Sequence, residues 1–347
     1  MPQLHGTLPQ TQPDIGAPMP FRFLLTTLMA LLWGATAQAQ CVGTNLIDAL
    51  PQTDQTDLTT AAHAAPFATG NFWQATRGDQ TITIAGTFHL DDPRHDAAMQ
   101  TLLPHLATAT TLMVEAGPEE QAALDQKLAA DPSAMMDPGG AGLQSALSPD
   151  EWTQLTAALL QRGIPSAMAD TLRPWFVSML LAIPPCALQM AAAANGLDKR
   201  LIGAATDAGL PVTALEHYDT ALGLFDGLSM DEQLVMIGNA LHVEPQADDF
   251  LTTTADAYFK GDSRIVWEFS RYLALQLPGA DPVKTNTDFA KTEAALMTDR
   301  NRAWIAPIEA ALQNGPVFAA FGALHLSGDQ GVLALLQSAG FTITALP

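Results

Sequence analysis

The sequence TITIAGTFHL, residues 81–90, decides the fold predicted for this chain. Its first five residues alternate β-branched with small or apolar side chains, which is typical of a buried strand. That strand is expected to end at Gly86, three residues before His89. Asp92-Pro93 follows, an N-cap residue and a proline suited to the first helical position, so a helix is expected from there to about Leu106. The stretch predicts a strand, a Gly-x-x-His turn and a helix.

The same order of elements returns at the end of the chain. VFAAF, residues 317–321, is an apolar strand, and GALH, residues 322–325, repeats the Gly-x-x-His spacing. SGDQ, residues 327–330, is expected to cap a helix to about Ala339, and FTIT, residues 341–344, closes the chain as a strand. Two copies of one motif predict that the domain has two halves, which meet face to face.

Between the two copies, strands and helices alternate. TTLMV, residues 110–114, is expected to be a strand ending at Glu115, and the short strand at residues 212–215 ends at Glu216. Such alternation predicts an α/β fold with a central mixed sheet and helices on both faces.

The middle of the chain is predicted to be helical. Capping boxes begin helices at Ser148 and Ser229, a buried helix is expected at residues 175–183, and residues 245–314 are expected to be mostly helical. Residues 40–80 look loosely structured, with one short apolar patch around residues 72–73.

The first 39 residues are expected to be a cleaved signal peptide. Arg22 precedes an apolar run at residues 23–33, and Ala-Gln-Ala at residues 37–39 is a small-x-small cleavage site. The start codon is Met1 or Met19. The mature domain is therefore expected to span residues 40–347, in the periplasm or outside the cell, with no membrane span.

Export favours oxidised cysteines, and the chain has two, Cys41 and Cys186. We expect them to form a disulfide, with two free thiols as the alternative. Lysine and arginine number 15 against 36 acidic residues, a net charge of −21. Such an acidic surface repels phosphate and anionic lipid, which argues against nucleic acid or a membrane surface as a partner. The partner expected for the hydrolase considered below is a peptide or small-molecule substrate.

Four polar residues are expected at the carboxyl ends of strands, where α/β proteins place their catalytic groups. They are His89, Glu115, Glu216 and His325. The motif glycines, Gly86 and Gly322, allow a sharp turn or a close approach to a ligand. His89, His325 and Glu115 are the donors that a divalent metal such as manganese, cobalt or zinc accepts, and the same groups also suit metal-free acid–base chemistry. The sequence leaves both open.

Structural explanations also remain open for these residues. A histidine at a strand end often serves packing alone, and Glu115 or Glu216 can cap the helix that follows. Arg300 precedes a helix and can be an exposed residue; beside an anionic intermediate it would stabilise oxyanion charge.

Together these motifs resemble the TraB/PrgY/GumN family, which includes the Tiki Wnt-processing proteases. The resemblance rests on GTFHL at 86–90, Glu115, Arg300-Asn301 and FGALHLSG at 321–328, with GLD at 196–198 and Leu215-Glu216 in support. It implies a fold related to erythromycin-esterase and ChaN-like proteins, and a site made of His89, Glu115, Arg300 and His325.

Three functions follow as hypotheses. The first is an exported metal-dependent hydrolase, foremost a peptidase, since the chain has no Gly-x-Ser-x-Gly elbow and no His-Glu-x-x-His helix. The second is a non-catalytic protein that sequesters a peptide or a haem-like ligand. The third is a metal-free histidine/glutamate esterase. Oligomeric state and substrate identity do not follow from the sequence.

Overall fold

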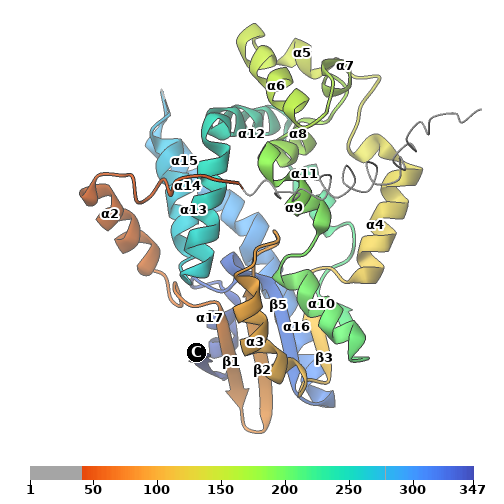
Figure 1. Cartoon of the computed structure of the whole chain (residues 1–347), viewed down its shortest axis with the longest axis vertical. Coiled ribbons are helices and arrows are strands. Elements are labelled where there is room, and N and C mark those ends of the chain that lie inside the picture. The colour runs from red at the N-terminus through yellow and green to blue at the C-terminus, as the bar shows by residue number, and fades with distance from the viewer. Residues whose placement is uncertain (1–40, 278) are drawn as a thin grey trace, which may run out of the picture. The chain divides into compact units, whose positions relative to one another are not determined.

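The computed structural model describes residues 41–277 and 279–347, so the predicted signal segment lies outside the described residues. Residues 41–347 form one compact unit (Figure 1). Its centre is a six-stranded mixed sheet with the strand order β4-β3-β5-β2-β1-β6. The strands are β1 (Phe72–Arg77), β2 (Gln80–Thr87), β3 (Thr111–Val114), β4 (Val212–Ala214), β5 (Val317–Gly322) and β6 (Thr342–Ala345).

Four neighbouring strands of this sheet run parallel. Strand β5 pairs with β2 on one side and with β3 on the other, and β3 pairs with β4. Strand β5, the last of the four parallel strands along the chain, therefore lies between the first two, β2 and β3. The carboxyl ends of β2, β3, β4 and β5 consequently meet at one edge, from which His89, Glu115, Glu216 and His325 follow.

Helices cover both faces of the sheet, as predicted. One face is packed by α3 (His95–Leu106) and α10 (Leu197–Asp207), and the other by α16 (Asp299–Ala311) and α17 (Val332–Ser338). Apolar side chains on alternate positions of the strands supply the core between these layers. Ile82 and Ile84 face α16 and α17, whereas Ala85 and Phe318 face α3 and α10.

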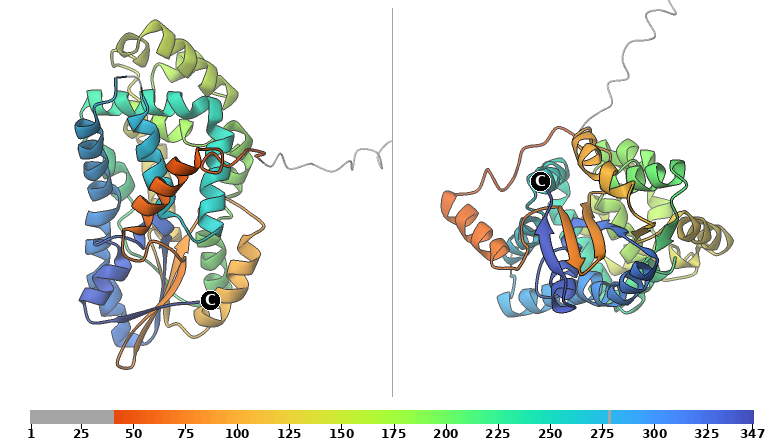
Figure 2. Two further views of the ribbon diagram at one scale, coloured as in Figure 1. Left: turned by 90° about the vertical axis from the view of Figure 1, so that its left-hand side faces the viewer. Right: turned by 90° about the horizontal axis from the view of Figure 1, so that it is seen from below.

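The helical middle section is confirmed and lies beyond one end of the strands (Figures 1 and 2). Both predicted capping boxes are present, at Ser148 and Ser229, each with reciprocal bonds to the glutamate three residues later. The helices are α4 (Pro118–Ala130), α5 (Leu143–Ala146), α6 (Pro149–Gln161), α7 (Ser166–Ala169), α8 (Pro174–Leu181), α9 (Leu188–Ala193), α11 (Thr220–Asp226), α12 (Met230–Val243), α13 (Ala247–Phe259), α14 (Arg264–Leu275) and α15 (Pro282–Glu293).

The loosely structured segment predicted for residues 40–80 is wrong. It contains helix α2 (Gln52–His63) and strand β1, which pairs antiparallel with both β2 and β6. Strand β1 buries only Trp73 and Ala75, and after Phe72 its other positions are polar, so its apolar pattern is short. Helix α2 buries only Leu58 and Ala62 and packs on α14, so tertiary contact rather than its own sequence stabilises it.

Both helices that follow the Gly-x-x-His motifs begin later than predicted. Helix α3 begins at His95, because the Asp92 carboxylate accepts bonds from the backbone and guanidinium of Arg94 and closes a turn there. Helix α17 begins at Val332 with Gly331 at its N-cap, after a 3₁₀ turn at Ala323–His325. The serine at 327 therefore does not cap a helix.

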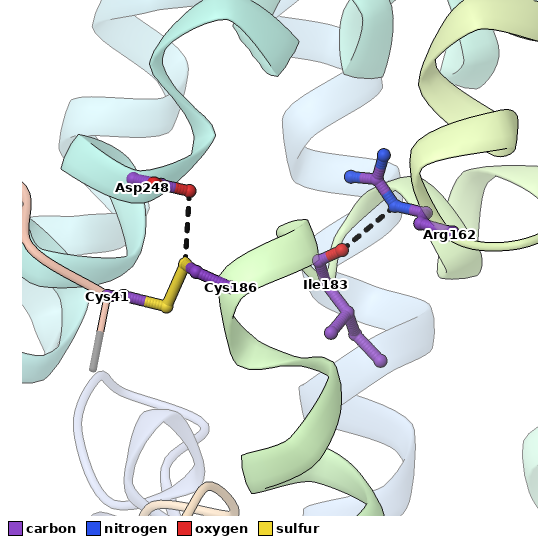
Figure 3. The surroundings of a disulfide bond; sticks show 5 residues. All are labelled: Cys41, Arg162, Ile183, Cys186 and Asp248. Carbon is purple, nitrogen blue, oxygen red and sulfur yellow. Dashed lines mark hydrogen bonds between the residues drawn. A yellow bond between two sulfur atoms is a disulfide. The ribbon is translucent and has the colours of Figure 1, made fainter. Parts of the chain in front are cut away.

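The predicted disulfide between Cys41 and Cys186 is present, with the Cα atoms 5.2 Å apart (Figure 3). It ties the start of the described chain to the 3₁₀ turn after α8. Close by, the buried Arg162 guanidinium donates to the carbonyl of Ile183 and to both carboxylate oxygens of Glu244. The bond to Ile183 satisfies a carbonyl that Pro184-Pro185 leave without a helical partner.

In the described part of the chain, no single helix has the length and apolar composition needed to cross a membrane. One sharply bent pair, Pro174–Leu181 with Pro185–Asp207, passes that test only when the two are taken together.

The disulfide should stabilise the fold substantially, because it closes a loop with a sequence separation of 145 residues. We expect Cys41→Ser to lower the free energy of unfolding by about 4–5 kcal/mol, measured by denaturant titration. Cys186→Ser and the double variant should lose the same free energy of unfolding as Cys41→Ser, since each of the three variants lacks the same disulfide. A double variant that is clearly less stable than either single variant would contradict this account.

Candidate functional site

Three of the four strand-end residues, His89, Glu115 and His325, gather around Gly322. A methyl group added at Gly322 would lie 3.4 Å from Glu115 Oε1, 3.6 Å from His89 Nε2 and 3.7 Å from His325 Cδ2. Two histidines separated by more than 200 residues thus face one point. The Gly322 N–H donates to Glu115 Oε1 at 2.6 Å, so this glycine also anchors the carboxylate.

Gly86, the glycine of the first motif, has a different structural role from Gly322. A methyl group there would lie 2.6 Å from Leu326 Cδ1 and 3.0 Å from the Cα of Ala323. Its hydrogen lets the 3₁₀ turn that carries His325 pack directly on strand β2. Gly86 therefore positions the second histidine without facing the site.

Arg300 joins the two glutamates. Its Nη2 donates to Glu115 Oε2 at 2.6 Å and to Glu216 Oε2 at 2.9 Å, and its Nε donates to Glu216 Oε1 at 2.6 Å. Its Nη1 donates to the Leu296 carbonyl at 3.0 Å and lies 3.3 Å from His325 Nε2. All five N–H groups of the guanidinium therefore have acceptors, so its direct role here is to position Glu115 and His325.

Glu216 serves Arg300 rather than the centre of the site. It also accepts a hydrogen bond from Trp304 Nε1 at 3.0 Å. Glu216 thereby holds the guanidinium from the side opposite Glu115.

His325 is buried, with 5% of its surface exposed. Asn301 Nδ2 donates to the Gln330 carbonyl at 2.8 Å, which leaves Asn301 Oδ1 to face His325 Nδ1 at 2.6 Å. His325 Nδ1 must then carry the proton, and its Nε2 presents a lone pair towards Arg300.

His89 is oriented by a carboxylate in a similar way. Its Nδ1 lies 3.3 Å from Asp198 Oδ1, slightly beyond a well-formed hydrogen bond, and its side chain is 62% exposed. A methyl group at Gly196 would overlap the backbone of His89, so only glycine lets the start of α10 approach this closely. That approach places Asp198 behind the imidazole and leaves Nε2 free towards Gly322.

The charges in this cluster shift its pKa values in opposite directions. Burial alone would raise the pKa of Glu115, but His325, His89, Arg300 and the Gly322 N–H lower it to about 2. Burial, together with Arg300 and His89, lowers the pKa of His325 to about 4, although Glu115 opposes this. Desolvation lowers the pKa of His89, but Asp198 and Glu115 outweigh it and raise that pKa above its ordinary value.

The chemistry of the donors suits a divalent metal. His89 Nε2, one Glu115 carboxylate oxygen and the ring edge of His325 face Gly322, and an oxygen acceptor lies behind each imidazole, as it does behind most metal-binding histidines. Within residues 41–277 and 279–347, however, no three His, Cys, Asp or Glu side chains stand close enough to form a metal-binding group. Arg300 donates to Glu115 and adjoins His325 Nε2, so both of these groups already have a partner.

Sequence reasoning missed several supporting residues. Asn301 stands in the same motif as Arg300, and Asp198 stands in GLD at 196–198, but neither had been given a role. Trp304 is fully buried and packs against His325, with the ring centres 4.5 Å apart and the rings tilted by 43°. Of these residues, Asp198 carried the clearest sequence signal of a role in the site. It stands at the second position of a helix, where a carboxylate is favourable and can orient a neighbouring imidazole.

A mixed sheet with paired Gly-x-x-His motifs at its carboxyl edge defines an α/β protein with a histidine–glutamate–arginine site. The model of the TraB/PrgY/gumN family matches residues 71–345, and the chain belongs to that family. No curated protein matches the chain with significant similarity.

The two histidines should titrate far apart in metal-free protein. NMR of the imidazole C–H resonances, recorded with chelator present, should give a pKa of about 4 for His325 and a value above 6.5 for His89. Because the unfolded chain protonates His325 before the folded protein does, this residue should lower the free energy of unfolding as the pH falls from about 6.5 to 4. A His325 that titrates above His89 would refute the described environment.

Proposed function

We propose that this protein is a hydrolase, foremost a peptidase, in which His89, Glu115 and His325 act on one water molecule. The observation that carries the proposal is their convergence on Gly322, with both imidazoles oriented from behind by Asp198 and Asn301. Export from the cytoplasm, predicted from residues 1–39, remains part of this proposal.

Without a bound metal, His89 is the proposed base of the reaction. Its Nδ1–H faces Asp198, so Nε2 can take a proton from water, and the carboxylate stabilises the imidazolium that forms. Glu115 stays ionised because of its low pKa and offers acceptor oxygens to the same water. His325 stays neutral near pH 7, and its Nε2 lone pair is fixed by Asn301.

A divalent metal is proposed as cofactor, with His89, Glu115 and His325 as its ligands. The buried cluster contains two carboxylates, Glu115 and Glu216, and one guanidinium, Arg300. The net charge of the cluster is therefore negative, which favours binding of a cation. A bound metal would lower the pKa of its water and supply the nucleophile without a serine or cysteine.

A metal-free hydrolase of esterase type is the second candidate. It is favoured by the 2.6 Å bond between Arg300 and Glu115 and by the 3.3 Å distance from Arg300 to His325 Nε2. In that case His89 with Asp198 would be the sole base.

Replacing either histidine should abolish hydrolysis. We expect His89→Ala and His325→Ala each to lower kcat at least 100-fold on peptide substrates, because each supplies a group to one water. His89 is exposed, so its variant should melt like the wild type, whereas His325→Ala should also lose about 1–3 kcal/mol of stability by leaving Asn301 unpaired.

His242→Ala is the matched control. His242 is an exposed residue of α12, so its loss should change neither rate nor melting temperature. Normal turnover by folded His89→Ala protein would rule out the proposed base.

Metal dependence can be measured separately from activity. Protein stripped by chelator should bind one Mn²⁺, Co²⁺ or Zn²⁺ per chain in calorimetry, and His89→Ala should weaken binding by at least tenfold. The same metals should restore hydrolysis. Hydrolysis that survives complete chelation supports the metal-free candidate, and peptide binding without turnover identifies a sequestering protein instead.

A further inference from the structure

Two cavities meet at the site. One, of about 370 Å³, extends towards α10, and the other, of about 310 Å³, extends towards α13 and α14. Thr87, His89 and Glu115 line both. A substrate that reaches the proposed water therefore has room on two sides of it.

The smaller cavity has an apolar wall. Its apolar lining residues include Phe88, Val266, Trp267, Leu296, Met297 and Leu324. Arg300 and His325 lie on the same wall, but their polar atoms are engaged with one another and with Glu115 and Asn301. The space thus favours a bulky apolar group beside the reacting centre.

An irregular turn of helix shapes this wall. Residues Ala294–Thr298 form a π-helical turn between α15 and α16, and Leu296 and Met297 both face the cavity. The Leu296 carbonyl at the same turn accepts from Arg300 Nη1. The π turn therefore couples the wall of the cavity to the ion cluster, and such turns are frequent at functional sites.

Thr87 is the polar group where the cavities meet. It is 3% exposed, and its hydroxyl has no hydrogen-bond partner in the described part of the chain. A buried hydroxyl without a partner destabilises a folded protein, so valine would fit the same position better unless the hydroxyl serves a ligand. Its place on the lining of both cavities makes it available to a substrate that spans them.

We infer that the substrate is a peptide cleaved beside a bulky apolar residue, whose side chain occupies the smaller cavity while the Thr87 hydroxyl bonds its backbone. This inference rests on the proposed hydrolase function and specifies its substrate class. Thr87 is a binding residue, and the apolar wall determines specificity.

The test uses the whole mature chain and quenched fluorescent peptides of alanine in which one central position is Phe, Leu, Ala, Asp or Lys. Wild-type protein should cleave the Phe and Leu peptides at least tenfold more efficiently than the Ala, Asp and Lys peptides. Thr87→Val should lower kcat/KM for the Phe peptide about tenfold without lowering the melting temperature, since no protein bond is lost.

Thr253→Val is the matched control. Thr253 is also fully buried, but its hydroxyl bonds the Asp249 carbonyl and the Leu46 N–H. Its variant should melt lower and keep the peptide preference. Leu296→Trp, which fills the cavity, should shift the preference from Phe to Ala at least tenfold, whereas Met179→Trp on the exposed surface of α8 should not.

The outcomes separate the inference from the function on which it rests. Hydrolysis without preference for Phe or Leu, or a Thr87→Val enzyme as efficient as wild type, overturns the inference and leaves the hydrolase standing. If no peptide is cleaved, the proposed hydrolase function is wrong. Calorimetry with the Phe and Ala peptides then tests whether the cavity binds an apolar side chain. Binding that favours Phe and weakens in Thr87→Val upholds the apolar pocket and the Thr87 contact without cleavage, and the absence of such binding overturns them as well.

Discussion

The site depends on one buried ion cluster in which Arg300 bridges Glu115 and Glu216. The guanidinium side chain is 16% exposed and the two carboxylates are 21% and 11% exposed, so none is well solvated. Buried charges persist only where their hydrogen bonds are satisfied, and here all five guanidinium N–H groups have acceptors. The cluster therefore ties the ends of β3 and β4 to α16 and to His325.

That cluster can form because β5 lies between β2 and β3. Neighbouring parallel strands have their carboxyl ends at the same edge of the sheet. In such sheets a crevice forms where the order of strands in the sheet differs from their order along the chain. Gly322, the last residue of β5, then stands between the groups that follow β2 and β3. A metal or water at this point would meet donors from both halves of the chain at once.

Sequence patterns predicted all the strands except β1, and they also missed helix α2. Strands β2, β3 and β5 are buried over most of their length and rich in β-branched or apolar residues, so their positions were clear. Strand β1 and helix α2 bury two residues each, too few to set a period. The late starts of α3 and α17 reflect local turns, in which Asp92 and the 3₁₀ turn at Ala323–His325 compete with helix.

The sequence by itself determined the repeated Gly-x-x-His motif, the strand-end glutamates, the family and the cysteine pair, because each is a local pattern or a count. Only the tertiary structure decided that Glu216 holds Arg300 and that Asp198 and Asn301 orient the two imidazoles. It also decided that the Thr87 hydroxyl, on the lining of two cavities, has no partner among the described residues. These roles depend on contacts between segments far apart in the chain. Periodicity records which face of an element is buried, but not which distant group it meets there.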